Sequence, residues 1–350
     1  MKKILIIGIG LIGGSFAKAL KSSSNEYEIS ATDLNLESLE FALKEKIIDK
    51  IHQFPIDSSS YFDLIVISSP LSSYKTIFEK INNNISEKIP IIIDLGSVKN
   101  KILGYVPENI KRKYIGCHPI AGYHNSGIEN SDKNLFNKKL FFICKNKINS
   151  DDDVMEIEKL LKDIKSIPKY ISSNEHDNLY ALISHLPQFL SFLTKDFNDS
   201  ELNSDFFKTS FRLDNSSPDI WRDIFSLNEN NIEKFYIEFF SILENIIEKI
   251  SRNEFKEALD YIGNDIEIYL DSSLRLENLV EEVKSFIIFR LLIVGCFLKI
   301  KEVKLYQNLS GQGFKDFILI INLLSLDKKV LENLLKKFKS DILKFFKSIS

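Results

Sequence analysis

The chain has 350 residues, of which 44% are hydrophobic and 27% are charged, and its formal net charge is −3. The length predicts two domains with room for an appendage, and the composition is typical of a folded protein and excludes a disordered chain. The near balance of charges lacks the basic excess of a nucleic-acid-binding protein. The three cysteines form no CxxC pair, so we expect no disulfide framework and a cytoplasmic location.

Four of the 13 glycines lie in the first 14 residues. An apolar run over residues 3–7 predicts a buried strand that leads into a GxGxxG pattern, and a helix is expected over residues 15–21. Such glycines permit a tight turn, close approach of a pyrophosphate and close helix–strand packing. The alternative is a secretory signal with an Ala17-Lys18-Ala19 cleavage site. The pattern favours a dinucleotide site at Gly8, Gly10, Leu11, Ile12 and Gly13.

A second strand, predicted over residues 28–32, ends at Asp33, 20 residues after Gly13. A carboxylate there can accept hydrogen bonds from the adenosine ribose and would repel a 2′-phosphate. The cofactor predicted from this spacing is therefore NAD rather than NADP. An alternative role for Asp33 is to cap a helix that starts at Leu36.

Further short apolar runs alternate with helical segments. They predict strands over residues 63–68, 91–94, 113–117, 140–144 and 169–171, with an amphipathic helix over 151–165. The pattern indicates an α/β domain with a Rossmann-type, doubly wound and mostly parallel sheet. Because ligands bind beyond the carboxyl ends of such strands, Ser69 and Pro70 are expected to line the cofactor site.

His118 follows one of the predicted strands, in the segment Gly116-Cys117-His118-Pro119-Ile120-Ala121-Gly122. A histidine at a strand end beside a nicotinamide is suited to accept the proton of an alcohol that is being oxidised, because its pKa lies near neutrality. The alternative is a structural histidine in a loop.

From residue 174 onward the pattern is helical. His185 lies on an apolar helix, where a histidine is typically a core residue, and Arg212 lies among apolar neighbours, where a guanidinium suits a carboxylate ligand. The only tryptophan is Trp221. No spacing of histidines and cysteines predicts a metal site.

Five segments in this order resemble the prephenate/arogenate dehydrogenase family of tyrosine biosynthesis, and the resemblance covers roughly residues 1–270. They are Gly8-Ile9-Gly10-Leu11-Ile12-Gly13-Gly14-Ser15; Asp94-Leu95-Gly96-Ser97-Val98-Lys99; His118-Pro119-Ile120-Ala121-Gly122 with Ser126-Gly127; Ser184-His185-Leu186-Pro187; and Phe207…Arg212…Pro218…Trp221.

The resemblance implies a fold, a division into domains and a reaction. We expect an NAD-binding Rossmann domain over residues 1–170, an all-α substrate and dimerisation domain over 171–272, and an extra helical tail over 273–350. The implied reaction is the NAD-dependent oxidative decarboxylation of prephenate. An alternative of another class is a non-catalytic NAD-binding regulatory protein, although Ser97, His118, His185 and Arg212 are all present.

The resemblance also implies roles for individual residues. His118 would accept the proton of the substrate's C4 hydroxyl, and Ser97 would orient His118 and the nicotinamide. His185, Arg212 and Trp221 would contact the substrate, with Arg212 on a carboxylate.

Two positions depart from the family pattern. Tyr123-His124 stands where an acidic residue is frequent, and Thr209 stands where an aspartate is frequent. An acid near the substrate's side chain would favour arogenate, whose amino group is cationic. Its absence favours prephenate, and His124 could add positive charge for this dianion. An arogenate or dual-specificity cyclohexadienyl dehydrogenase stays the alternative.

The tail over residues 273–350 reads helical and falls short of a membrane span. One hypothesis is that the tail is a degenerate duplicate of the helical domain. In that alignment, Ile293 replaces His185 and Leu319 replaces Arg212. Chance similarity between apolar helices is the alternative. We expect a homodimer with a small-molecule substrate, unless the tail replaces the partner subunit.

Overall fold

The computed structural model describes residues 2–24, 26–53, 59–85, 88–122, 126–193 and 218–263, with isolated positions between 296 and 343. The chain forms two compact units. The first comprises residues 1–178 and 217–228, and the second comprises residues 179–216 and 229–350. The three domains expected from the sequence, with boundaries after residues 170 and 272, stay a prediction.

The first unit is built on an eight-stranded sheet with the strand order β3-β2-β1-β4-β5-β6-β7-β8. Every neighbouring pair is parallel except β6 and β7. The strands are β1 (Lys2–Ile7), β2 (Tyr27–Thr32), β3 (Lys50–Ile51), β4 (Leu64–Ile67), β5 (Ile91–Asp94), β6 (Tyr114–Pro119), β7 (Leu140–Cys144) and β8 (Ile167–Tyr170).

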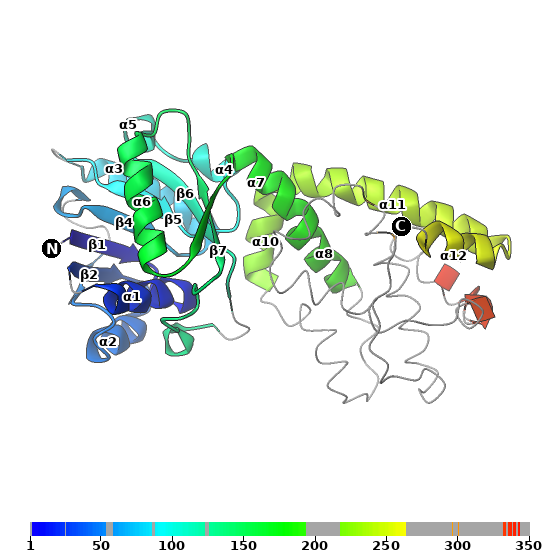
Figure 1. Cartoon of the computed structure of the whole chain (residues 1–350), viewed down its shortest axis with the longest axis horizontal. Helices are drawn as coiled ribbons and strands as arrows, with labels where there is room; N and C mark the ends of the chain where they lie inside the picture. Colours follow the sequence, from blue (N-terminus) through cyan, green and yellow to red (C-terminus); the bar gives the residue numbers. More distant parts are fainter. Residues whose placement is uncertain are drawn as a thin grey trace. The chain divides into compact units, whose positions relative to one another are not determined.

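Helices cover both faces of this sheet (Figure 1). Alternate residues along a strand point to opposite faces, and the apolar strands therefore supply two cores. Ile4 and Ile6 of β1 belong to the core beneath α1 (Leu11–Ser23), α2 (Leu36–Lys44) and α6 (Asp151–Asp163). Leu5 and Ile7 belong to the core on the other face. That second face is covered by α3 (Tyr74–Asn83), α4 (Asn100–Leu103), α5 (Glu108–Lys111) and α10 (Pro218–Leu227).

The architecture confirms the Rossmann-type sheet followed by helices, with three differences in detail. Helix α1 begins at Leu11, so Gly13 and Gly14 lie inside it. Strand β6 extends to Pro119, so His118 lies on the strand and not after it. Strand β7 runs antiparallel to β6. The sequence did not predict this direction, because an apolar run indicates that a strand is buried but not which way it runs.

The second unit is helical in its described parts. Helix α7 (Ser173–Tyr180), whose residues up to Asn178 belong to the first unit, continues through a π-helical turn (Ala181–His185, labelled η4) into α8 (Leu186–Leu193). The Leu186 amide donates to the Ala181 carbonyl, five residues back. Pro187, the next residue, has no amide hydrogen to continue the α-helical pattern, which accounts for a wide turn at this point.

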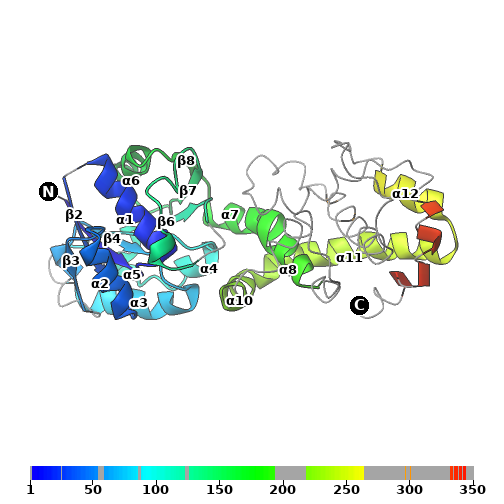
Figure 2. The ribbon, with the colours of Figure 1, turned by 90° about the horizontal axis from the view of Figure 1, so that it is seen from below.

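Two further helices in the described part of this unit are α11 (Glu229–Ser251) and α12 (Phe255–Gly263), labelled in Figure 2. Tail residues contact the turn between them. The Lys339 ammonium donates to the Ser251 carbonyl at 2.7 Å and to Asn253 Oδ1 at 2.8 Å. A cation at the carbonyl end of α11 is favourable to the helix dipole. No helix in the described part of the chain is long and apolar enough to cross a membrane.

Candidate active site

The predicted dinucleotide turn joins β1 to α1. Gly8 has φ +93°, and a Cβ atom there would lie 2.8 Å from backbone atoms of Ser68 and Ser69. At Gly13 a Cβ atom would lie 2.1 Å from the Gly8 carbonyl oxygen. Both positions therefore require glycine for the turn to pack against the end of β4. At Gly10, in contrast, a Cβ atom would meet nothing within 4 Å.

Helix α1 presents its first amide groups at this turn. It is capped by Gly10 without a side-chain hydrogen bond, and no acidic residue lies in its first turn. The unsatisfied N–H groups and the positive end of the helix dipole suit a pyrophosphate. Leu11 and Ile12, the first helical residues, are half-buried. The turn thus fits the phosphates of a dinucleotide, with open space at Gly10.

Asp33 follows β2 at the same edge of the sheet. Its Oδ2 atom accepts from the Ile9 amide at 2.7 Å, and its Oδ1 atom accepts from the Asn35 amide at 2.9 Å. The cap of α2 is Asn35, not Asp33. Each carboxylate oxygen has a second lone pair that suits a ribose hydroxyl. This arrangement fits the adenosine side of NAD.

Ser69 and Pro70 follow β4. The hydroxyl groups of Ser69 and Ser73 lie 2.9 Å apart, and Pro70 precedes a 3-10 turn (Leu71–Ser73, η2). The loop is anchored from α10, because Asp223 Oδ2 accepts from the Ser72 amide at 3.0 Å. The two residues therefore lie at the carboxyl edge of the sheet, where the sequence places them.

A pair of glycine variants tests the dinucleotide turn. We expect Gly10→Ala to raise the Kd for NAD by about tenfold or more while thermal stability stays unchanged, because its methyl group meets no protein atom within 4 Å but would hinder the approach of a pyrophosphate to the backbone. Gly13→Ala is expected to lower the melting temperature as well, since its methyl group overlaps backbone. Calorimetric titration with NAD and thermal unfolding measure both effects. Unchanged NAD affinity in Gly10→Ala would contradict the placement.

His118 is half-buried near the end of β6 and is held by a second histidine. Its Nδ1 atom lies 2.8 Å from Nε2 of His176, which is fully buried on α7. The His176 ring stacks edge-on against Phe142 of β7, with ring centroids 5.9 Å apart. His176 Nδ1 in turn lies 2.8 Å from Oδ1 of Asp177.

Asp177 connects this pair to the loop that carries Ser97. Its Oδ1 atom accepts from the Lys99 amide at 2.8 Å, and its Oδ2 atom accepts from the Asn100 amide at 2.7 Å. The carboxylate therefore binds the amides at the start of α4. Asn228, at the end of α10, donates from Nδ2 to the Asp177 carbonyl at 2.8 Å. Asp177 is 1% exposed, and its hydrogen bonds to His176, to the amides at the start of α4 and to Asn228 hold it in place.

Residues on either side of Ser97 in the sequence, Asp94 and Lys99, belong to a buried ionic cluster. The Lys99 ammonium donates to Asp94 and also to the Cys117 carbonyl at 2.7 Å. Tyr114 donates its hydroxyl hydrogen to Asp94 Oδ1 at 2.7 Å. Burial and the Asp94 charge raise the pKa of Tyr114 well above its ordinary value, so Tyr114 stays a donor. The cluster ties β5 to the residue that precedes His118.

The other predicted substrate residues are distributed over both units. Trp221, on α10, packs half-buried against the first unit's core, with its ring centroid 5.6 Å from that of Phe225. His185 ends the π-helical turn of the second unit, where it is buried with its ring centroid 6.5 Å from that of Tyr180. His124 and Arg212 lie outside the described residues, as do Ile293 and Leu319 of the proposed duplicate. The substrate roles of these residues stay predictions.

Sequence reasoning missed His176, Asp177 and Lys99. His176 carried a signal, because the chain has only five histidines. It stands in a polar segment, Glu175-His176-Asp177, which reads as an ordinary helix start. Lys99 lies in one of the family-like segments, but lysine is common throughout this chain, so no separate role was predicted for it.

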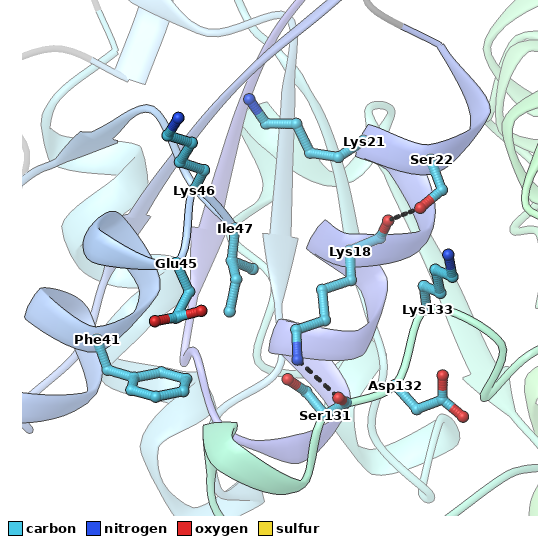
Figure 3. A pocket seen from close by; sticks show the side chains of 10 residues that line it. All are labelled: Lys18, Lys21, Ser22, Phe41, Glu45, Lys46, Ile47, Ser131, Asp132 and Lys133. Carbon is cyan, nitrogen blue, oxygen red and sulfur yellow. Dashed lines mark hydrogen bonds between the residues drawn. The ribbon is translucent and has the colours of Figure 1, made fainter.

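A separate hollow of about 380 Å³ lies on the side of the first unit (Figure 3). It is lined by the second half of α1, the end of α2 and residues 131–133, and none of the predicted site residues lines it. The Lys18 ammonium within it donates to the Ser131 carbonyl at 2.7 Å. Among the residues that the structure describes, no three histidine, cysteine or acidic side chains gather closely enough to hold a metal ion.

The dinucleotide turn and the held histidine share the carboxyl edge of one doubly wound sheet, which is the arrangement of a nicotinamide-dependent dehydrogenase. Two family models match the chain. They are "Prephenate dehydrogenase, nucleotide-binding domain" over residues 16–167 and "Prephenate dehydrogenase, dimerization domain" over residues 172–264.

Relatives agree with these matches. The crystal structure of prephenate dehydrogenase from Aquifex aeolicus in complex with hydroxyphenyl propionate and NAD+ is 31% identical, with a TM-score of 0.67 over 75% of this chain and 96% of that chain. The prephenate dehydrogenase of Bacillus subtilis is 28% identical over 276 residues, 74% of each protein. The chain belongs to the prephenate dehydrogenase family.

The family includes other substrate preferences. The cyclohexadienyl dehydrogenase of Zymomonas mobilis is 24% identical over 64% of this chain and 80% of its own length. The arogenate dehydrogenase of Synechocystis is 21% identical with a TM-score of 0.62, over 75% of this chain and 96% of that chain, and this likeness shows the fold alone.

Proposed function

We propose that this enzyme catalyses the NAD-dependent oxidative decarboxylation of prephenate to 4-hydroxyphenylpyruvate, a step of tyrosine biosynthesis. The observation that carries the proposal is His118 on β6, at the sheet edge that also bears the dinucleotide turn, with its Nδ1 atom held by His176. NAD supplies the acceptor for the hydride that leaves C4 of the substrate. The prephenate dehydrogenase of Bacillus subtilis and the NAD+ complex of the Aquifex aeolicus enzyme support both the reaction and the cofactor.

His118 acts on the hydroxyl group at C4. Its Nε2 atom accepts the hydrogen bond of this hydroxyl and takes its proton as the C4–H bond breaks. Loss of CO₂ from C1 then completes an aromatic ring, so the reaction proceeds in one direction. Ser97 is half-buried in the loop after β5, between Asp94 and Lys99 in the sequence, and these two residues form the buried ion pair. In this mechanism Ser97 orients His118 and the nicotinamide end of the cofactor.

The substrate's carboxylates require cationic partners. Arg212 binds one of them, and His124 adds positive charge to the pocket. His185 and Trp221 contact the ring. The roles of Arg212, His185 and Trp221 rest on the match between this sequence and the family pattern, whereas that of His124 rests on the departure from it.

Comparison of two substrates tests the proposal. We expect kcat/KM for prephenate to exceed that for arogenate, because Tyr123-His124 and Thr209 replace the acids that would bind an amino group. NAD should also be preferred to NADP, since Asp33 repels a 2′-phosphate. Steady-state rates with each substrate and cofactor measure both preferences. A higher kcat/KM for arogenate would favour the cyclohexadienyl or arogenate alternative, and turnover of neither would favour the non-catalytic one.

The second family model names a dimerisation domain, and oligomer formation is expected from it. We propose a homodimer. The contact of Lys339 with the α11–α12 turn supports a tail that packs on the helical unit. The cytoplasm stays the proposed location, on the argument from the cysteines.

A further inference from the structure

Two buried side chains and the half-buried His118 form a continuous hydrogen-bonded series. The series runs from Asp177 through His176 to His118, with both contacts at 2.8 Å. Asp177 and His176 are 1% and 0% exposed, so water does not compete for their hydrogen bonds. The donor and the acceptor of each hydrogen bond can therefore be assigned from the other hydrogen bonds that the three side chains make.

The first bond must be donated by His176. Both oxygens of Asp177 accept from backbone amides, those of Lys99 and Asn100, and an ionised carboxylate can only accept. The hydrogen between Asp177 Oδ1 and His176 Nδ1 therefore belongs to the histidine. One ring hydrogen of His176 is thereby located on Nδ1.

The second bond must be donated by His118. Burial lowers the pKa of His176 well below its ordinary value, and the Lys99 charge lowers it further, so His176 is neutral. A neutral imidazole that carries its hydrogen on Nδ1 has a lone pair on Nε2. This lone pair faces Nδ1 of His118, which must supply the hydrogen. The hydrogen of a neutral His118 is then on Nδ1, and its Nε2 atom carries a lone pair.

We propose that His176 and Asp177 are positioning residues that keep the Nε2 atom of His118 unprotonated and oriented to receive the proton of the substrate hydroxyl. This inference rests on the proposed role of His118 as the base. After the transfer, His118 carries both ring hydrogens, and its charge is stabilised by the lone pair of His176 and the carboxylate behind it. The proton stays on His118, because a second positive charge beside buried Lys99 is unfavourable.

Two substitutions at His176 separate positioning from packing. His176→Leu keeps an apolar side chain beside Phe142 but removes the acceptor, whereas His176→Gln retains an oxygen that can accept from His118. We expect His176→Leu to lower kcat by about tenfold to 100-fold with KM for NAD unchanged. The glutamine variant should recover most of this loss. Thermal unfolding of both variants measures the packing contribution.

The pH profile supplies a readout that packing alone does not move. The acid-side pKa in kcat/KM should fall in His176→Leu, because the acceptor that stabilises protonated His118 is gone. Among the residues that the structure describes, the charged or titratable groups around the pair include Asp177 on α7, Lys99 before α4, Asp94 on β5, Cys117 on β6 and Cys144 on β7, and these stay in place. A wild-type kcat and pH profile in His176→Leu would overturn the proposal, as would equal losses in both variants.

Nitrogen-15 NMR of the histidine rings tests the inference without substrate. In the wild-type enzyme with NAD, the His118 signal, assigned from its absence in His118→Asn, is expected to show the hydrogen on Nδ1. A hydrogen on Nε2 would overturn the inference even if prephenate is oxidised. The Nδ1 form in an enzyme that does not oxidise prephenate would instead overturn the proposed function and leave the positioning role intact.

Discussion

Replacement of His118 by asparagine is expected to lower kcat for prephenate by about 10²- to 10⁴-fold, which is the usual contribution of a positioned general base. An asparagine amide cannot take the hydroxyl proton at neutral pH. NAD affinity should stay unchanged, because the proposed cofactor-binding residues are the glycine turn at Gly8 to Gly13 and Asp33, which the substitution leaves intact. Single-turnover rates of NADH formation and calorimetric titration with NAD measure the two quantities.

His52 provides a matched control for this substitution. It lies next to β3, and its ring packs against Phe62 with centroids 5.4 Å apart, outside the proposed catalytic residues. His52→Asn should therefore keep the wild-type kcat. Full turnover in His118→Asn, combined with normal NAD binding, would remove His118 from the mechanism and favour a water molecule as the proton acceptor.

The second large effect is expected on stability. Lys99→Met should lower the free energy of unfolding by about 3–5 kcal/mol, because it leaves the Asp94 carboxylate buried without its cation. Lys99 and Asp94 are both fully buried, and the methionine also loses the hydrogen bond to the Cys117 carbonyl. Chemical denaturation of the variant against the wild type measures the difference.

Two further variants show whether the buried charge is the cause. The double variant Asp94→Asn with Lys99→Met removes both charges and should recover part of the loss. Arg252→Gln breaks an exposed ion pair with Glu248 and should change the free energy of unfolding by less than about 1 kcal/mol. A Lys99→Met enzyme as stable as Arg252→Gln would show that the buried ion pair does not stabilise the fold.

The sheet was largely predictable from the sequence, because buried parallel strands are short apolar runs. Residues 91–94 and 140–144 were predicted with the bounds that the structure shows. Strand β3 was missed, since its two residues, Lys50 and Ile51, are exposed and too few to show a period. The start of α1 was placed four residues late, because glycines are poor helix formers and here lie in the helix for close packing.

The candidate site was predictable only where a motif spans it. The glycine turn and His118 belong to local patterns, whereas the partner of His118 lies 58 residues further along the chain. Nothing near His176 in the sequence indicates contact with β6. Lys99 shows a second limit: its burial depends on Asp94 and on the Cys117 carbonyl, and such a pairing is a property of the folded chain.

The first unit is assembled from two separate stretches of chain, and this has a consequence for its synthesis. The polypeptide leaves the unit after residue 178 and returns at residue 217 to add α10. Asn228, the last residue of that return, holds the carbonyl of Asp177. A nascent chain that has completed all eight strands therefore still lacks the contact that secures the aspartate behind His176. The surroundings of His118 are complete only when residue 228 has left the ribosome, so the sheet can form well before the enzyme can act.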